Sequence, residues 1–149
     1  EIHERLVGSE MCIRDRQYAV YAKCAAHHGL TVNELFVLDI LWFSPDGCTQ
    51  TDICRRLSAN KQTIAAITGR FLKKGYISLQ EVKEDRRNKR IIFTDKGKAY
   101  AQDIIPYAAH AEKLAMEQMG ETNAAELVRL ATKFTENMEI CFSEAIRKN

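Results

Sequence analysis

Apolar residues recur at helical spacing along most of the chain, and glycine or turn residues interrupt this pattern at several points. A first helical pattern runs from Gln17 and stops at Gly29. The next segment begins with Thr31 and Glu34, which have the spacing of a capping box, and continues with apolar residues on nearly every side. A helix that is apolar all round must be buried, so residues 31–43 are predicted to form the centre of the core.

Two short helices are predicted to follow. Thr49 and Asp52 have the spacing of a second capping box, and Asn60 is a suitable N-cap for the next helix. Residues 58–60 separate the two helices, and Gly75 ends the second. The second helix carries three apolar residues on one side, namely Ile64, Ile67 and Phe71. Two short helices joined by so short a turn predict a helix-turn-helix.

A charged β-hairpin is predicted directly after the helix-turn-helix. Residues 77–79 and 90–94 are rich in β-branched and other strand-forming side chains. The connection from Lys83 to Lys89 is highly charged and contains no apolar residue. A hairpin with a charged tip in this position is typical of a wing.

The C-terminal part of the chain is predicted to form two further helices. Thr94 is expected to cap one long helix that is kinked at Pro106 and ended by Gly120. The last helix starts near Thr122 and repeats apolar residues at alternating spacings of four and three: Leu127, Ala131, Phe134, Met138, Cys141 and Ala145. This heptad seam has no other obvious surface to cover. We therefore expect a homodimer held mainly by the last helix.

Residues 1–16 have the least coherent pattern in the chain. Gly8 and Ser9 interrupt a weak helical pattern, and no clean apolar face is present. The run 7–16 also resembles a translated sequencing adapter. We therefore set residues 1–16 apart as a doubtful, non-native segment and expect it to contribute nothing specific to DNA binding.

The distribution of charge points to a polyanionic partner. The chain has a net charge of +2, but residues 46–97 hold twelve Lys and Arg against six Asp and Glu, whereas the rest holds ten against fourteen. A basic middle between acidic ends is typical of a nucleic-acid-binding module, because neutralised phosphates supply most of the affinity.

Composition excludes several other classes of protein. Hydrophobic residues make up 46% of the 149 residues, which is enough for an ordinary globular core. The longest strongly apolar stretch is far shorter than a membrane span, and the charged N-terminal residues lack the apolar core of a secretory signal. We therefore expect no membrane association and a cytoplasmic location.

These patterns together predict a mainly α fold with a small β wing. Residues 46–97 are expected to form a winged helix-turn-helix DNA-binding domain. Residues 17–45 and 98–149 are expected to form N- and C-terminal dimerisation helices around it.

The order of elements and the wing sequence resemble the MarR family of transcription regulators. The family's wing pattern is Asp-x-Arg followed by apolar-x-apolar-Thr-x-x-Gly, and it is matched by Asp85, Arg87, Ile91, Phe93, Thr94 and Gly97. The helix from Lys61 to Gly75 also resembles that family's recognition helix. This resemblance implies a homodimer that binds a pseudo-palindromic site in double-stranded DNA, with a small aromatic effector binding between the dimerisation helices and the winged domain. Four aromatic residues are candidates for that pocket: Tyr18, Tyr21, Trp42 and Tyr107.

The residue types on the predicted recognition helix and wing fit DNA. With the apolar side facing inward, the helix turns Gln62, Ala66 and Lys73 outward and carries Thr63 and Arg70 on one flank. Side chains suited to phosphate contacts lie at the helix start and in the wing: Asn60, Lys61, Lys83, Arg86 and Lys89. Arg87 is expected to enter the minor groove, and Asp85 to orient it.

Several other interpretations stay open on the sequence. The winged fold can serve as a protein-interaction module without DNA binding. Cys24, His27, His28 and His110 suggest a metal- or thiol-responsive repressor, as Cys54 does for redox sensing, and a cysteine-dependent enzyme is a further alternative. The five cysteines form no CxxC pair, which favours reduced thiols over a disulfide framework or a zinc ribbon. We expect no cofactor, no metal and no enzymatic activity.

Overall fold

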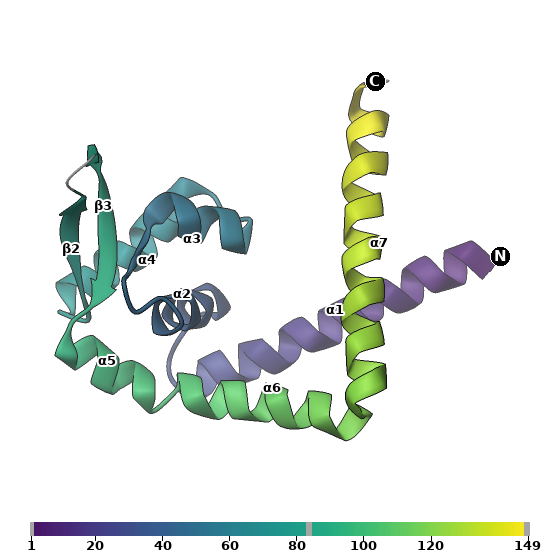
Figure 1. Cartoon of the computed structure of the whole chain (residues 1–149), viewed down its shortest axis with the longest axis horizontal. Helices are drawn as coiled ribbons and strands as arrows, with labels where there is room; N and C mark the ends of the chain where they lie inside the picture. Colours follow the sequence, from purple (N-terminus) through teal and green to yellow (C-terminus); the bar gives the residue numbers. More distant parts are fainter. Residues whose placement is uncertain (1, 83–84, 148–149) are drawn as a thin grey trace. The chain divides into compact units, whose positions relative to one another are not determined.

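The structure is a computed structural model that describes the backbone of residues 2–82 and 85–147 and the side chains of residues 8–81 and 89–147. It is mainly helical with one small sheet, as predicted (Figure 1). The elements are α1 (Ile2–His27), α2 (Val32–Trp42), β1 (Cys48–Thr49), α3 (Gln50–Leu57), α4 (Lys61–Lys73), β2 (Ile77–Val82), β3 (Asp85–Phe93), α5 (Asp95–Gln102), α6 (Ile105–Met119) and α7 (Glu121–Arg147). They divide into two compact units, Glu1–Ala108 and Ala109–Asn149.

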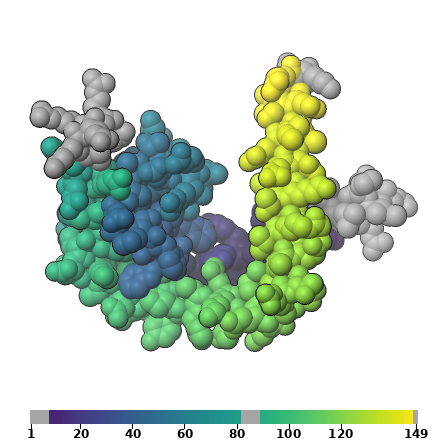
Figure 2. All heavy atoms as spheres, viewed as in Figure 1, coloured from purple at the N-terminus to yellow at the C-terminus, as the bar shows by residue number. Residues whose placement is uncertain are grey.

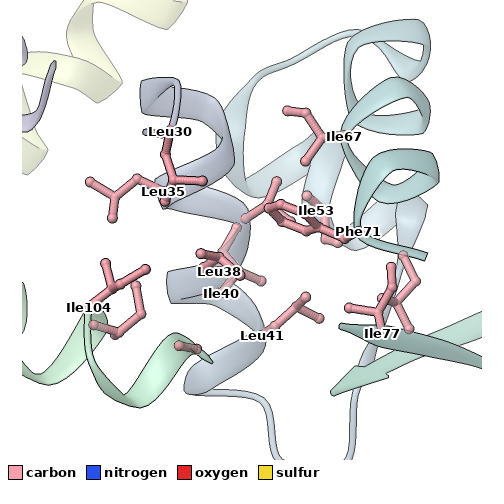
Figure 3. Close-up of a cluster of buried hydrophobic side chains, with 14 of the residues drawn as sticks. Leu30, Leu35, Leu38, Ile40, Leu41, Ile53, Ile67, Phe71, Ile77 and Ile104 are labelled. Atoms are coloured by element: carbon pink, nitrogen blue, oxygen red, sulfur yellow. The ribbon is translucent and has the colours of Figure 1, made fainter. Parts of the chain in front are cut away.

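Helix α2 is the centre of the first unit, and its predicted capping box is confirmed. The Thr31 hydroxyl accepts a hydrogen bond from the Glu34 N–H at 3.2 Å, and the Glu34 carboxylate accepts one from the Thr31 N–H at 2.8 Å. Seven residues of α2 are buried, which confirms the expectation from its all-round apolar pattern. Figure 3 shows Ile104 on one side of α2 and Ile53, Ile67, Phe71 and Ile77 on the other.

The helix-turn-helix consists of α3 and α4. The capping box of Thr49 and Asp52 begins α3, and the Asn60 side chain accepts the Thr63 N–H at 2.8 Å at the start of α4. Between the helices, Ser58 adopts a left-handed conformation with φ 48°. The Ala59 N–H donates to the Cys54 carbonyl at 3.0 Å, which closes the turn.

The wing belongs to a three-stranded antiparallel sheet with strand order β1-β3-β2. Cys48 pairs with Ile91 and Ile77 pairs with Phe93, with an irregularity between Glu81 and Val82. Strand β1 is too short to carry a periodic signal, so the sequence does not predict it. Strand β3 starts within the predicted 83–89 connection, because backbone pairing in a hairpin does not require apolar side chains.

Two expected helix boundaries are wrong. The long helix expected after Thr94 is two helices, α5 and α6, separated at residues 103–104. Proline has no N–H and its ring clashes with the carbonyl four residues earlier, so Pro106 lies in the first turn of a new helix rather than at a kink. Helix α1 continues through Gly8 without a break. A single glycine costs only about 1 kcal/mol inside a helix, which does not end this one.

Helix α7 forms most of the second unit, Ala109–Asn149, and its heptad residues are largely exposed. Figure 2 shows the side chains of α7, coloured yellow-green to yellow, as spheres along the length of the helix. Its large exposed apolar side chains are Leu127, Val128, Leu130, Phe134, Ile140, Phe142 and Ile146. Among the described residues, no helix combines the length and apolar composition needed to cross a membrane.

Candidate nucleic-acid interface

Helix α4 buries one face and exposes the opposite one, in the orientation that the sequence predicts. Ile64, Ile67 and Phe71 are buried in the core. On the other side, Gln62, Ala66 and Lys73 are exposed, together with Gly69. The exposed residues can thus reach a ligand in front of the helix, which is what a groove-facing surface requires.

The start of α4 is held by its cap and by α3. Asn60 and Lys61 are exposed, and Thr63 is half-buried. The Gln50 side-chain amide, at the start of α3, donates to the Lys61 carbonyl at 3.3 Å. This bond joins the first turns of the two helices, and no local pattern in the sequence indicates it because the two residues lie eleven positions apart.

Arg70 has a partner in another helix. Its Nε donates to Glu34 Oε1 at 2.9 Å, and the Arg70 side chain is 50% exposed whereas that of Glu34 is 11% exposed. Burial raises the pKa of Glu34, but hydrogen bonds from Thr31 and Arg70 outweigh it, so the pKa lies below its ordinary value. Sequence reasoning identifies Glu34 as a capping residue and misses its ion pair with α4.

The C-terminal end of α4 is held by the segment that leads into α5. The Thr94 hydroxyl donates to the Gly75 carbonyl at 2.6 Å, and Lys96 Nζ donates to the Lys74 carbonyl at 2.8 Å. The Tyr76 ring stacks on the Tyr100 ring with centroids 4.4 Å apart. The carbonyls that directly follow α4 therefore have donors, and this end of the helix is fixed relative to α5.

A shallow cavity of about 320 Å³ lies between α4 and the wing. Leu72 and Leu79 contribute partly exposed apolar surface to it, and Lys89 contributes a cation. The remaining lining residues are Gln50, Ala65, Thr68, Gly69 and Ile91. Of the wing residues predicted to contact DNA, Lys89 is exposed at this site. The side chains of Lys83, Asp85, Arg86 and Arg87 lie outside the described residues.

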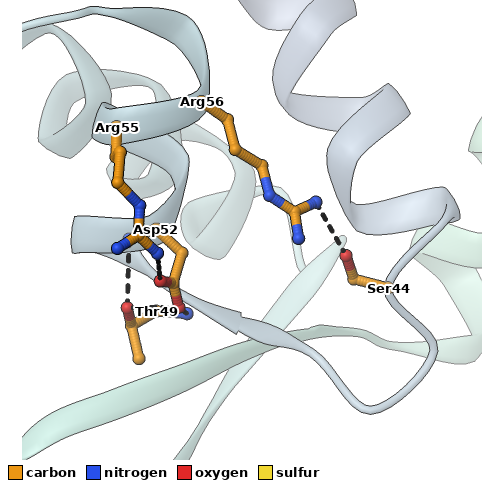
Figure 4. Close-up of polar contacts among 5 residues, drawn as sticks. All are labelled: Ser44, Thr49, Asp52, Arg55 and Arg56. Carbon is orange, nitrogen blue, oxygen red and sulfur yellow. Dashed lines mark hydrogen bonds and ion pairs between the residues drawn. The ribbon is translucent and has the colours of Figure 1, made fainter.

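Three arginines near α3 are engaged by protein groups. Arg55 pairs with Asp52 at 2.6 Å, and Arg56 donates to the Ser44 hydroxyl at 3.4 Å (Figure 4). The hydrogen bonds from Thr49 hold the pKa of Asp52 below its ordinary value. Arg90 donates to the Asp46 carbonyl at 3.2 Å. The bonds of Arg56 and Arg90 thus tie α3 and β3 to the loop at residues 44–47.

The four aromatic candidates for an effector pocket do not share one environment. Tyr21 and Trp42 are half-buried and pack against the core, and the Tyr21 ring meets the Phe36 ring edge-to-face at 5.2 Å. Tyr18 and Tyr107 are exposed. A common site for the four residues therefore stays a prediction.

The cysteine and histidine candidates show no metal-binding arrangement. Within the part of the chain that the structure describes, no three His, Cys, Asp or Glu side chains are grouped to hold a metal ion. The His27 and His28 rings meet edge-to-face with centroids 5.0 Å apart. Cys24 and Cys54 are half-buried, and burial raises the pKa of the Cys48 thiol, which disfavours its reactive thiolate form.

Comparison with known proteins agrees with this geometry. A model of the MarR family matches residues 28–88. The HTH-type transcriptional regulator TtmR of Methylorubrum extorquens is 29% identical over 89 residues, which cover 58% of this chain and 45% of TtmR. The chain thus matches less than half the length of this curated relative.

Solved structures match over nearly the whole chain. NMB1585, a MarR family regulator from Neisseria meningitidis, is 26% identical with a TM-score of 0.79, over 94% of this chain and 96% of NMB1585. The transcriptional repressor CouR, bound to a 23-mer DNA duplex, is 25% identical with a TM-score of 0.70, over 91% and 95% of the two chains. With its winged helix-turn-helix and these matches, the chain is similar to MarR family regulators in fold and in sequence.

Proposed function

We propose that the protein is a transcription regulator that binds duplex DNA through α4 and the wing. The observation that carries the proposal is the exposed polar face of α4, which is held by α3 at its start and by the α5 segment at its end. A major groove admits one α-helix, and a helix with fixed ends can present side chains to base edges reproducibly. The similarity to CouR, which was solved on a DNA duplex, supports this role.

Each exposed residue has a role set by its chemistry. Gln62 can bond an adenine edge through its amide, and the Ala66 methyl can meet a thymine methyl. Lys61, Lys73 and Lys89 are exposed cations suited to phosphates. Asn60 and Thr63 would lie at the phosphate beside the helix start, where helix N–H groups attract anions.

We further propose that two copies associate through α7 and bind a pseudo-palindromic site. The heptad seam of α7 leaves Leu127 and Phe134 largely exposed in the single chain. Covering such a stripe with its own copy buries apolar area on both partners and creates two-fold symmetry. Two recognition helices would then read two half-sites.

A small aromatic effector is part of the same proposal. The rings of Tyr21 and Trp42 are half-buried, which leaves part of each ring for stacking. Trp42 is the single tryptophan of the chain, so its fluorescence reports binding nearby. We expect at least one member of a panel of phenolic acids to quench it saturably and to release DNA over the same concentration range. Quenching without any release would remove the regulatory role.

The DNA proposal is tested by titrating the protein against mixed genomic DNA fragments at several salt concentrations. We expect affinity to fall steeply with salt, because each neutralised phosphate releases counterions. Lys73→Ala should weaken binding to all sequences and lower the salt slope by about 1. Lys98→Ala, an exposed lysine on α5, is the matched control and should leave the slope unchanged. No salt-dependent binding by the parent protein would favour the protein-interaction module.

Sequence preference is tested separately by selection from randomised duplexes. Gln62→Ala should relax preference at one position in each half-site, at a cost of about 1 to 3 kcal/mol for each bidentate hydrogen-bonded pair that it removes. Gln102→Ala, on the exposed side of α5, should keep the parent's preferences. If both variants select the same sites as the parent, α4 does not read bases through Gln62.

The wing is tested by Arg87→Ala, on the sequence-based expectation that this arginine enters the minor groove. We expect affinity to fall at least about tenfold and a preference for A·T pairs flanking the half-sites to fade. Asp85→Ala should give a milder defect, because it removes the orienting partner and leaves the charge. Unchanged binding by Arg87→Ala would remove the wing from the mechanism.

A further inference from the structure

We infer that Glu34 and Arg70 form a positioning pair that sets the recognition helix against α2, so that Arg70 acts on DNA recognition through Glu34. This inference rests on the proposed DNA-binding function and replaces the sequence-based expectation that Arg70 is itself a groove-facing contact. It adds Glu34, a residue outside the DNA-facing surface, to those that determine binding.

The Glu34 carboxylate is used twice. Its Oε2 accepts the Thr31 N–H at 2.8 Å, which completes the capping box of α2. Its Oε1 accepts Arg70 Nε at 2.9 Å, which reaches across from α4. One nearly buried carboxylate therefore links the turn between α1 and α2 to the recognition helix.

The position of Arg70 on α4 allows its bond to Glu34 to restrain the rotation of the helix. It lies on α4 between Phe71, which is buried in the core, and Gly69 on the exposed face. Directing its Nε to Glu34 restrains the guanidinium on the side of α4 nearest α2. A rotation of α4 about its axis would break this bond and also shift the exposed face that carries Gln62 and Lys73.

Removing either partner has a cost that an exposed ion pair would not have. The Glu34 side chain is only 11% exposed, so loss of Arg70 leaves a poorly solvated carboxylate. The contrasting case is the pair of Arg55 and Asp52, in which the arginine side chain is 75% exposed and both residues lie on α3. That pair joins no two helices and serves as an internal comparison.

The decisive variant is Glu34→Gln, because the two roles of Arg70 predict opposite effects on DNA affinity. Glutamine keeps one acceptor for the cap and loses the charge that holds Arg70. If Arg70 is a positioning residue, affinity for a duplex selected by the parent protein should fall about fivefold or more. If Arg70 contacts DNA directly, releasing it and removing a nearby negative charge should leave affinity equal or higher.

Arg70→Gln and the double variant complete the test. The positioning role predicts that Arg70→Gln weakens binding without lowering the salt slope by about 1, because every phosphate keeps its cation. The double variant should bind no more weakly than the weaker single variant, since both changes break one link. Asp52→Asn is the matched control: it also neutralises a capping carboxylate and should keep or raise affinity. Tighter binding by Glu34→Gln, or a salt slope lowered by Arg70→Gln, would overturn the inference.

A second readout keeps this inference distinct from the proposed function. Thermal unfolding without DNA measures the coupling between the side chains. It is measured for the parent, Glu34→Gln, Arg70→Gln and their double variant, and for Arg55→Gln and its double variant with Glu34→Gln. We expect a non-additive effect on the melting temperature for Glu34 with Arg70, and additive effects for Glu34 with Arg55. Additive effects in both pairs would overturn the link even if DNA binding is intact. If the parent binds no DNA but the pair is coupled, the proposed function fails and the link between the helices stands.

Discussion

Thr94 and Gly97, at the start of α5, have structural roles that explain the Thr-x-x-Gly pattern at this position. The Thr94 hydroxyl accepts the Gly97 N–H at 3.0 Å, which caps α5, and donates to the Gly75 carbonyl. Gly97 is buried against the backbone of Tyr76, and a Cβ at position 97 would overlap the Tyr76 carbonyl. Both residues therefore serve the packing of α5 on the end of α4.

We expect Gly97→Ala to lower the free energy of unfolding by about 2 kcal/mol or more, because the added methyl can be accommodated only by moving backbone. Gly69→Ala is the matched control. A Cβ at Gly69 meets nothing within 4 Å, so alanine should raise helix stability by up to about 1 kcal/mol. Urea unfolding of the two variants measures both values. Equal stabilities would show that the packing of α5 on the end of α4 relaxes freely.

The sequence is informative at this scale where the signal is local. The caps at Thr31, Thr49 and Asn60 can be predicted because each depends on residues within three positions. The bond between Glu34 and Arg70 spans 36 positions, and no periodic pattern reports such a pair. An arginine on the flank of a predicted recognition helix is therefore interpreted, from the sequence, as a DNA contact.

At the scale of elements, the recognition helix is restrained at three places by three neighbours. Gln50 bonds its first residue, Glu34 bonds Arg70 in its last turn, and Thr94 bonds Gly75 just after its end. The buried helix α2 and the apolar side of α4 can be predicted from periodicity, because burial forces a repeating pattern. The expected boundaries in α1 and at Pro106 are wrong, because a glycine or a proline changes a helix by amounts that its context decides.

Helix α7 is predicted to hold the dimer together through its apolar seam. Replacing Phe134 and Met138 by Asp should give monomeric or insoluble protein, because charges on the seam cannot be desolvated in a coiled-coil contact. Multi-angle light scattering measures the change in mass. A soluble dimer of this double variant would show that the seam is not the interface.

The control for this experiment uses the same helix and the same charge. Thr132 and Ser143 lie on the side of α7 opposite the seam and are exposed. The double variant Thr132→Asp with Ser143→Asp should stay dimeric. Dissociation of both double variants would attribute the effect to the net charge of α7 and not to the seam.

At the scale of the whole molecule, basic residues are concentrated in the part of the chain that is proposed to bind DNA. The middle of the chain, residues 46–97, has a net charge of +6, and the remaining residues have −4. A dimer through α7 would carry two basic modules, each able to neutralise phosphates, while the acidic parts would be repelled by DNA. If the protein binds DNA as proposed, this distribution of charge would favour contact of residues 46–97 with the duplex before any base is contacted.

Two-fold symmetry makes the spacing of the half-sites a measurable consequence of the proposal. Two recognition helices in one dimer read half-sites about one helical turn apart, or a multiple of it. Inserting about 5 base pairs between the half-sites of a selected duplex turns one of them to the opposite side of the DNA, so we expect affinity to fall about tenfold or more. Replacing central base pairs without changing the length is the control and should have a smaller effect. Binding that is indifferent to the insertion would mean that each recognition helix acts alone, and the proposed dimeric recognition of the site would then be wrong even though α4 binds DNA.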